Sequence, residues 1–454
     1  MTRFQSSVCW ALTLTTLSLL CALRAGAQDP AAKLDEYLTT ATQLGRFSGS
    51  VLVAREGTIL LSKGYGMANQ ELDVPNTPQT KFRIGSVTKT FTAAGVLLLQ
   101  ERGRLSVQDP VCKYLTDCPD TWGEITLHHL LTHTSGIPDY LSFPDYFRTM
   151  RDPVSPAELI ARFRDRSLDF PPGREYRYSN SGYILLGQVI ARASGQGYAE
   201  FLRQNIFLPL KMLNTGYDLP VRVLKNRASG YSRTGATVIN APFIATAVTH
   251  SAGALFSTVE DLYLWDQGLY TDRPLGAASR AAMFTAVKND YGYGWGVGKE
   301  INRRNIAHTG MINGFTAILS RFPDERLIII VLTNSDHTAP GVRRVARDLA
   351  AIVLGEPYDL PRARASVAVA VEILDSYVGE YEVQPGSLVT ITRIGARLAV
   401  QTVPLPPYDL VAESETRFYC DVLDTYISFV RDEAGRVTEL VLHQRPEQKA
   451  RKVK

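Results

Sequence analysis

The segment IGSVTKTFTAAGVLLLQERGRL, from Ile84 to Leu105, decides the interpretation of the fold around it. Its apolar residues recur at helical spacing after a glycine and a serine, and Gly103 follows the last charged pair. We therefore predict a helix that starts near Ser86 and stops before Gly103. Ser86 and Lys89 stand three positions apart at the start of this helix, which places them on one face.

This pair suits nucleophilic catalysis. A serine hydroxyl is a weak nucleophile until a base takes its proton, and a partly desolvated lysine can lose its own proton near neutral pH. Backbone N–H groups at the helix start favour developing negative charge. Ser86 and Lys89 thus predict acyl transfer through a covalent serine ester, although the motif alone is weak because Ser-x-x-Lys often arises by chance.

Apolar segments on both sides of this helix have the patterns of strands. Residues 48–66 (SGSVLVAREGTILLSKGYG) predict a hairpin, and residues 291–298, 314–323 and 325–334 predict three more β-segments. Helical patches fill the middle of the chain, from about 110 to 275, and VRRVARDLAAIVLG predicts a closing helix that ends at Gly355. We expect an α+β fold: one antiparallel sheet flanked by helices, with a helical insert beside it.

The composition changes near residue 358. Residues 358–372 resemble a linker, and residues 373–454 contain short β-runs separated by turns, including Asp432-Glu433-Ala434-Gly435. We therefore expect a main domain over residues 28–357 and a small all-β domain, a barrel, over 373–454.

The N-terminus has the features of an export signal. A basic start, an apolar run and the small residues Ala25-Gly26-Ala27 predict a signal peptide over residues 1–27. The alternative is a membrane anchor, but the run is short for a bilayer, so we expect no stable span after cleavage. The expected location is secreted or periplasmic. The formal charge of +4 forms no basic stripe, which argues against nucleic acid as a partner.

Cysteine and histidine positions are compatible with export and predict no metal site. Cys112 and Cys118 bracket KYLTD in a turn-rich stretch and predict a short-loop disulfide in an oxidising compartment, the alternative being two unpaired thiols. Cys420 is expected to be a buried small residue. His129 and His133 stand four positions apart, but the glutamate of a metalloprotease helix is missing, so a structural role is favoured.

Two further motifs follow Ser86 and Lys89 in order along the chain. Tyr178-Ser179-Asn180 follows a proline-rich turn, and His308-Thr309-Gly310 opens a predicted strand. Separately, these residues could be a surface aromatic, a helix cap and a polar strand end. Together, at domain-scale spacing, the three motifs argue against those separate interpretations.

From about Asp35 to Gly355 the chain resembles the serine β-lactamase and penicillin-binding superfamily, in its class C-like branch. The phrases FRIGSVTKTFTA, LLTHTSGIPDY, FPPGREYRYSNSGYILLG and HTGMINGF carry the resemblance. It implies a β-lactamase/transpeptidase-like fold, and the distal segment resembles the lipocalin-like β domain appended to some members. It implies no metal and no organic cofactor.

The resemblance also implies roles for the motif residues. Ser86 would be the acylated nucleophile, Lys89 would share its proton, and Tyr178 would act as general base and acid, with a positive Lys89 lowering its pKa. Substrate contacts would come from Asn180, His308, Thr309 and Gly310. The oxyanion hole would be the backbone N–H groups of Ser86 and Met311.

One departure from the efficient class C β-lactamases narrows the expected activity. Their third motif begins with lysine, whereas this chain has His308, which is mostly uncharged at neutral pH. Histidine at this place is found in D-alanyl-D-alanine carboxypeptidase and esterase members of the family. We expect a serine hydrolase of D-amino-acid peptides or small esters and amides, with cell-wall peptide among the candidate substrates. The alternatives are a class C-like β-lactamase and, in another class, a non-catalytic penicillin-binding or sensor protein.

Overall fold

The computed structural model describes residues 29–234, 237–338, 341–362, 366–384, 387–402, 407–423, 425–443 and 447–454. The predicted signal peptide, residues 1–27, lies outside the described residues. Within the described ranges, no helix has both the length and the apolar character needed to cross a membrane.

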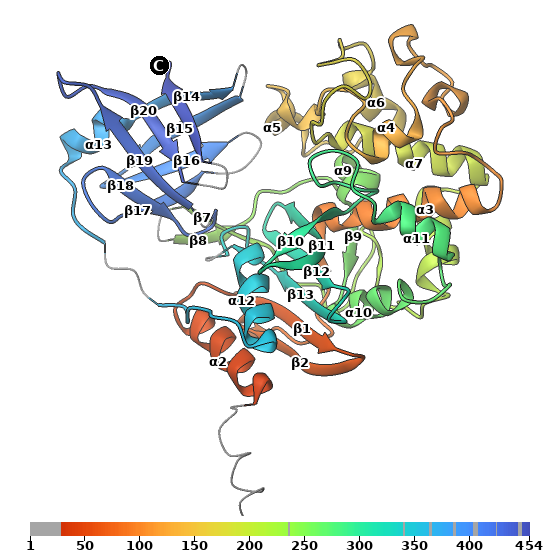
Figure 1. Cartoon of the computed structure of the whole chain (residues 1–454), viewed down its shortest axis with the longest axis horizontal. Coiled ribbons are helices and arrows are strands. Elements are labelled where there is room, and N and C mark those ends of the chain that lie inside the picture. Colours follow the sequence, from red (N-terminus) through yellow and green to blue (C-terminus); the bar gives the residue numbers. More distant parts are fainter. Residues whose placement is uncertain are drawn as a thin grey trace, which may run out of the picture.

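A six-stranded antiparallel sheet lies at the centre of the larger part of the molecule (Figure 1). In spatial order its strands are β10 (Gly296–Glu300), β11 (Arg303–Ile312), β12 (Phe315–Phe322), β13 (Leu327–Thr333), β1 (Gly49–Arg55) and β2 (Thr58–Tyr65). The first hairpin therefore pairs with a strand far along the chain, with Gly49 opposite Thr333. This pairing confirms the expected sheet, in which segments from both ends of the domain are adjacent.

Both faces of the sheet are covered, which explains why the central strand β13 is buried throughout and apolar up to its last residue, Thr333. On one face, Val51, Ile329 and Val331 pack with α2 (Pro30–Gln43) and α12 (Val342–Leu354) in a shared core. On the other face, the alternate residues of the same strands join the larger core with the remaining helices. The main ones are α3 (Thr88–Glu101), α7 (Asn180–Ser194), α9 (Thr246–Gly253), α10 (Val259–Gly268) and α11 (Ala277–Met283).

Short elements complete this part. The helical insert adds α4 (Leu127–Leu131), α5 (Tyr146–Thr149), α6 (Pro156–Arg164) and α8 (Tyr198–Leu202), with the single turns η2 (Val111–Tyr114), η3 (Asp120–Trp122), η4 (Tyr140–Ser142) and η5 (Arg203–Phe207). Another single turn, η1 (Gly85–Val87), directly precedes α3. The small strands are β3 (Met67–Asn69), β4 (Val74–Pro75), β5 (Phe82–Arg83), β6 (Gly216–Tyr217), β7 (Tyr231–Thr234), β8 (Thr237–Asn240) and β9 (Leu255–Ser257). Cys112 and Cys118 are joined by a disulfide in this region.

The C-terminal part is a closed barrel of eight antiparallel strands. They are β14 (Gly379–Gln384), β15 (Ser387–Ile394), β16 (Arg397–Thr402), β17 (Tyr408–Ala412), β18 (Arg417–Cys420), β19 (Thr425–Arg431), β20 (Val437–Leu442) and β21 (Gln448–Lys452). Inward residues, including the free thiol of Cys420, fill it with a core of its own. The β-runs expected over residues 373–454 begin only at Gly379, because α13 (Val371–Tyr377) precedes β14 and packs Leu374 and Tyr377 into this core.

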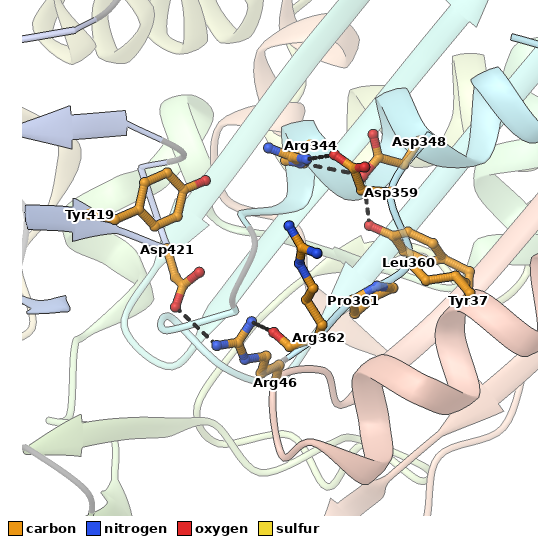
Figure 2. Close-up of a pocket in the computed structure, with 10 residues that line it drawn as sticks. All are labelled: Tyr37, Arg46, Arg344, Asp348, Asp359, Leu360, Pro361, Arg362, Tyr419 and Asp421. Atoms are coloured by element: carbon orange, nitrogen blue, oxygen red, sulfur yellow. Dashed lines mark hydrogen bonds and ion pairs between the residues drawn. The ribbon is translucent and has the colours of Figure 1, made fainter. Parts of the chain in front are cut away.

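The barrel docks beside β7, β8 and α12 (Figure 1). At one edge of this junction, Arg46 donates to the Asp421 carboxylate at 3.2 Å and to the Arg362 carbonyl at 3.0 Å (Figure 2). The Gly341 N–H also donates to the Asp421 carbonyl. The barrel is thus held against the sheet's α2/α12 side by bonds from several chain segments.

Candidate active site

Ser86 lies in the single turn η1, directly before α3, and not in the helix itself. The helix therefore begins at Thr88, two residues later than the sequence predicted. Gly85 makes the turn possible, since its φ of +48° is unfavourable for other residues and a Cβ there would lie 2.7 Å from the Met311 nitrogen. The serine is left half-buried at the point where η1 meets strand β11.

Lys89 is fully buried beneath Ser86 and has three polar partners. Its Nζ lies 3.0 Å from Ser86 Oγ, 2.8 Å from Asn180 Oδ1 and 2.9 Å from the Ala252 carbonyl oxygen. Burial lowers its pKa to about 7, while the negative charge of Asp139 opposes the shift. A large fraction of Lys89 is therefore neutral near pH 7.

The charge state of Lys89 decides how it uses these three contacts. A protonated lysine donates to all three oxygens, Ser86 Oγ included. The pKa of about 7 also makes a neutral amine abundant. Such an amine has two N–H donors and one lone pair. Because Asn180 Oδ1 and the Ala252 oxygen can only accept, they take the two N–H groups. The lone pair is left facing the Ser86 hydroxyl, where it can accept a proton.

Tyr178 lies next to both Lys89 and Ser86. Its ring is 4.9 Å from Lys89 Nζ and 4.2 Å from the His133 ring, between centroids. Burial raises the pKa of Tyr178, and a hydrogen bond with Ser86 opposes this only in part. The expectation of a lowered pKa was wrong, because burial outweighs any charge on a lysine that is itself near half-neutral at pH 7. In the free site Tyr178 is a protonated phenol, suited to donate a proton.

Asn180 is the first residue of α7, and Asp139 fixes its amide. The Asn180 Nδ2 donates to Asp139 Oδ2 at 2.9 Å, and the Asn180 backbone N–H donates to Asp139 Oδ1 at 3.2 Å. The amide oxygen is thereby turned toward Lys89. The sequence interpretation did not include Asp139, although it stands in the quoted phrase LLTHTSGIPDY; a carboxylate next to a family motif was the available signal.

His308 reaches the same cluster from strand β11 and is neutral. Its Nδ1 lies 2.6 Å from the Thr309 carbonyl oxygen, so that nitrogen carries the proton, and Nε2 accepts from the Tyr291 hydroxyl at 2.9 Å. Burial, with the charge on Lys89 as a smaller cause, lowers the pKa of His308 to about 3. The sequence interpretation did not identify Tyr291, which holds this ring in one tautomer.

His133 packs beside these groups. Its Nδ1 accepts from the Ser179 N–H at 3.1 Å, and its ring lies 4.8 Å from that of Tyr291. His129 caps its own helix instead, accepting from the Thr126 N–H through Nδ1. The two histidines therefore do not converge on one point.

Strand β11 brings the Met311 amide to Ser86. A two-residue turn follows Ile312 and places Ile312 opposite Phe315. In an antiparallel pair only every second residue bonds to the partner strand, so the N–H of Met311 points away from β12. Gly310 permits the close approach, since a Cβ there would lie 1.9 Å from the Ile84 oxygen and 3.1 Å from the Ser86 nitrogen. The amides of Ser86 and Met311 thus lie on the two sides of one narrow gap.

Thr309 occupies the opposite face of β11 from His308, because strand side chains alternate. A contact of Thr309 with substrate stays a prediction.

The structure gathers Ser86, Lys89, Tyr178, Asn180 and His308 at one point, and Gly310 and Met311 contribute backbone atoms. A serine hydroxyl beside a buried amine, a protonated phenol and two neighbouring backbone amides form the set of groups that acyl transfer requires.

The sequence matches known protein families and relatives. The family model described as Beta-lactamase matches residues 31–354, and a domain of unknown function (DUF3471) matches residues 363–454. Penicillin-binding protein 4* of Bacillus subtilis is 29% identical, over 94% of this chain and 100% of its own length.

Solved structures share the fold. The octameric penicillin-binding protein homologue from Pyrococcus abyssi has a TM-score of 0.65 and 25% identity, covering 92% of this chain and 99% of its own. The D-amino acid amidase from Ochrobactrum anthropi SV3 also has a TM-score of 0.65, at 24% identity, with 72% of this chain and 99% of its own covered. The first of these spans both the sheet domain and the barrel.

Proposed function

This chain belongs to the β-lactamase family and is a serine hydrolase, and on that premise we propose that it hydrolyses D-amino-acid peptides or small esters and amides through an acyl-Ser86 intermediate. The observation that carries the proposal is the partner set of Lys89. Both of its N–H groups face fixed acceptors, so the lone pair of the neutral amine faces the Ser86 hydroxyl.

The proposed acylation uses this geometry directly. Lys89 accepts the Ser86 proton as Oγ attacks the substrate carbonyl, and the amides of Ser86 and Met311 donate to the oxygen that becomes negative. As the carbonyl reforms, Tyr178 donates its phenolic proton to the departing amine or alkoxide, and Lys89 can restore it. Deacylation runs the same proton transfers backwards. Tyr178, after passing its proton to Lys89, accepts a proton from the water that attacks the ester carbon. Lys89 then returns a proton to Ser86 Oγ as the ester bond breaks, and the acid is released.

The neutral His308 favours a peptidase or esterase over a β-lactamase. A lysine in its place would offer a permanent charge to the carboxylate of a penicillin, whereas a buried imidazole bonded to Tyr291 offers none near pH 7. The penicillin-binding proteins among the relatives support slow acylation by such drugs as a side activity.

Intact-mass spectrometry with a penicillin and with a fluorophosphonate tests the proposal, using Ser86→Ala as the matched control. We expect the fluorophosphonate to label the wild type at Ser86 and not the variant, and the wild type to hydrolyse members of a D-peptide and ester panel. A drug consumed without an adduct would instead assign a β-lactamase. Labelling with no turnover of any panel member would favour a penicillin-binding or sensor protein.

Export is part of the proposal. The predicted signal over residues 1–27 and the Cys112–Cys118 disulfide support a secreted or periplasmic enzyme, because disulfides persist in oxidising compartments. Cell-wall peptide would be accessible to an enzyme in that location.

A further inference from the structure

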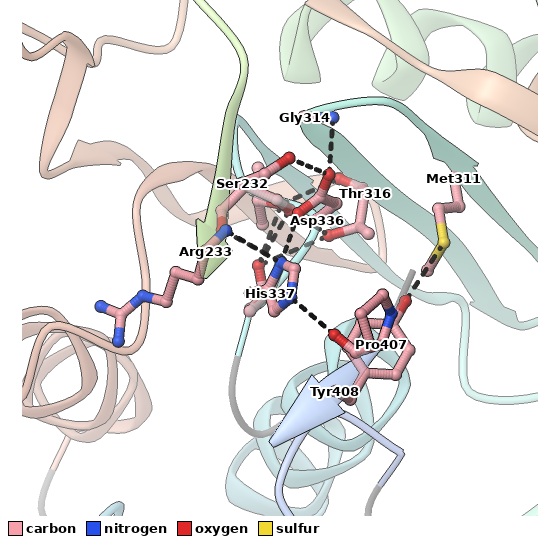
Figure 3. A network of polar contacts seen from close by, with 12 residues as sticks. Ser232, Arg233, Met311, Gly314, Thr316, Asp336, His337, Pro407 and Tyr408 are labelled. Carbon is pink, nitrogen blue, oxygen red and sulfur yellow. Dashed lines mark hydrogen bonds and ion pairs between the residues drawn. The ribbon is translucent and has the colours of Figure 1, made fainter. Parts of the chain in front are cut away.

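The barrel contacts strand β11, which carries the Met311 amide, on the face of the sheet opposite His308. Tyr408, the first residue of β17, is buried and its hydroxyl lies 3.5 Å from Met311 Sδ (Figure 3). Strand alternation puts the Met311 side chain on the face of the sheet opposite His308. The barrel therefore contacts β11 without entering the cluster around Ser86.

A buried carboxylate fixes the turn at the end of the same strand. The Gly314 N–H donates to Asp336 Oδ2 at 3.0 Å, and the Ser232 hydroxyl donates to the same oxygen at 2.6 Å. Gly314 has a φ of +76° and belongs to the two-residue turn between β11 and β12. Asp336 thus ties down the turn that sets the direction of the Met311 amide.

His337 joins this carboxylate to the barrel. Its Nδ1 lies 2.5 Å from Asp336 Oδ1, and its Nε2 lies 3.3 Å from the Pro407 carbonyl oxygen. The His337 ring also packs edge-on against Tyr408, with centroids 5.2 Å apart. The contact to Met311 on β11 and the contact to Gly314 in the following turn therefore both lead to Pro407 and Tyr408 of the barrel (Figure 3).

We propose that Asp336, His337 and Tyr408 form a brace through which the C-terminal barrel positions the Met311 amide for oxyanion stabilisation. The inference rests on the proposed function, because it assigns the three side chains to that reaction as positioning residues. An oxyanion donor acts only when it is held where negative charge develops, and small displacements of such groups cost large factors in rate. The barrel would then be a working part of the hydrolase.

Matched substitutions at the carboxylate test the brace in the full-length protein. Asp336→Ala should lower kcat for an ester, and the rate of Ser86 labelling by a fluorophosphonate, about ten-fold with KM within about two-fold. Asp336→Asn should recover most of the activity, since its amide oxygen can still accept from the Gly314 N–H. Asp348→Ala is the control: this buried carboxylate, on α12, bonds Tyr37 and not β11.

A second pair of substitutions tests the barrel end of the brace. Tyr408→Leu removes the contacts with Met311 and His337 and should lower kcat about five-fold. Tyr381→Leu is the control, because this equally buried tyrosine bonds the Tyr377 carbonyl inside the barrel.

The outcomes separate positioning from stability. Thermal unfolding is measured for every variant, and assays are run well below each midpoint. Unchanged kcat in Asp336→Ala and Tyr408→Leu, or equal losses in the two controls, would overturn the brace. A wild type that neither reacts with the fluorophosphonate at Ser86 nor hydrolyses any ester would contradict the proposed function itself, and the brace with it.

Discussion

Lys89 determines the pH dependence that we expect for acylation. Its pKa is lowered to about 7, and only the neutral amine can accept the Ser86 proton. The pKa of His308, about 3, lies far below neutrality and that of Tyr178 is raised, so neither should titrate between pH 5 and 9. We expect kcat/KM for a neutral ester to rise with pH, with a midpoint near 7, and to level off above it.

Stopped assays from pH 5 to 9 with a constant-ionic-strength buffer would measure this profile. Lys89→Arg is the control, since an arginine stays charged over this range and should be inactive at every pH. A flat profile would contradict the assignment of Lys89 as the base, and a falling limb below pH 9 would require a second titrating group.

Asp139 offers a sharper residue-scale prediction, because its substitution should move the midpoint as well as the rate. Its carboxylate holds the Asn180 amide and raises the pKa of Lys89. Asp139→Asn should lower kcat about ten- to one hundred-fold, the value of one or two charge-assisted hydrogen bonds. The midpoint of the pH profile should move to lower pH, since the opposing charge is gone. A midpoint that stays in place would show that Asp139 acts on Asn180 alone.

At the scale of elements, the close packing of β11 against η1 predicts that Gly310 cannot be changed. A Cβ there would lie 1.9 Å from the Ile84 oxygen, a backbone atom that cannot turn aside. Gly310→Ala should push β11 away from η1 and lower kcat at least about one hundred-fold, as for loss of an oxyanion donor. Gly298→Ala on neighbouring β10 is the control, because its Cβ would meet nothing closer than 3.9 Å.

Steady-state kinetics and circular dichroism on both variants would measure this effect. A Gly310→Ala protein that is folded and as active as Gly298→Ala would show that the gap between β11 and η1 is wider in solution than described.

Elements with a strong period and a glycine stop were predictable from the sequence. α12 ends at Gly355, a glycine with a φ of 73°, as the sequence predicted, and α7 ends in the same way at Gly195. α13 was not predicted, because seven residues give too little periodicity to distinguish a helix from a β-run.

The site residues that the sequence missed depend on contacts between distant segments. Asp139 meets Asn180 across 41 positions, and Tyr291 meets His308 across 17, so neither pair shows a local pattern. The predicted direction of the Tyr178 pKa shift was wrong for the same reason: the shift is caused by burial, and burial depends on the assembled fold. Motif residues were predictable because the resemblance supplied them; their supporting partners were not.

At the scale of the whole molecule, we propose that the linker at 358–372 divides the chain into a hydrolase domain and a barrel. Each part has its own apolar core, which supports the division. Polar bonds then hold the two together, with Arg46 at one edge of the junction and the His337–Pro407 contact near β11. Such a junction is compatible with a barrel that supports catalysis while keeping a separate core.

The last prediction concerns export. An exported chain should have lost its signal peptide and should also carry the disulfide, so both changes can be sought in the same mature protein. In a bacterial host, the periplasmic protein should have lost residues 1–27 and begin at Gln28. Denatured without reductant, it should take one alkyl group, on the buried thiol of Cys420, and after reduction three, with Cys112 and Cys118 added. The control is a variant that lacks residues 1–27 and stays in the reducing cytoplasm, which should take three alkyl groups without reduction. Intact mass reads both features at once: a full-length chain in the membrane fraction would instead support an anchor, and three alkyl groups on the periplasmic protein without reduction would contradict the disulfide.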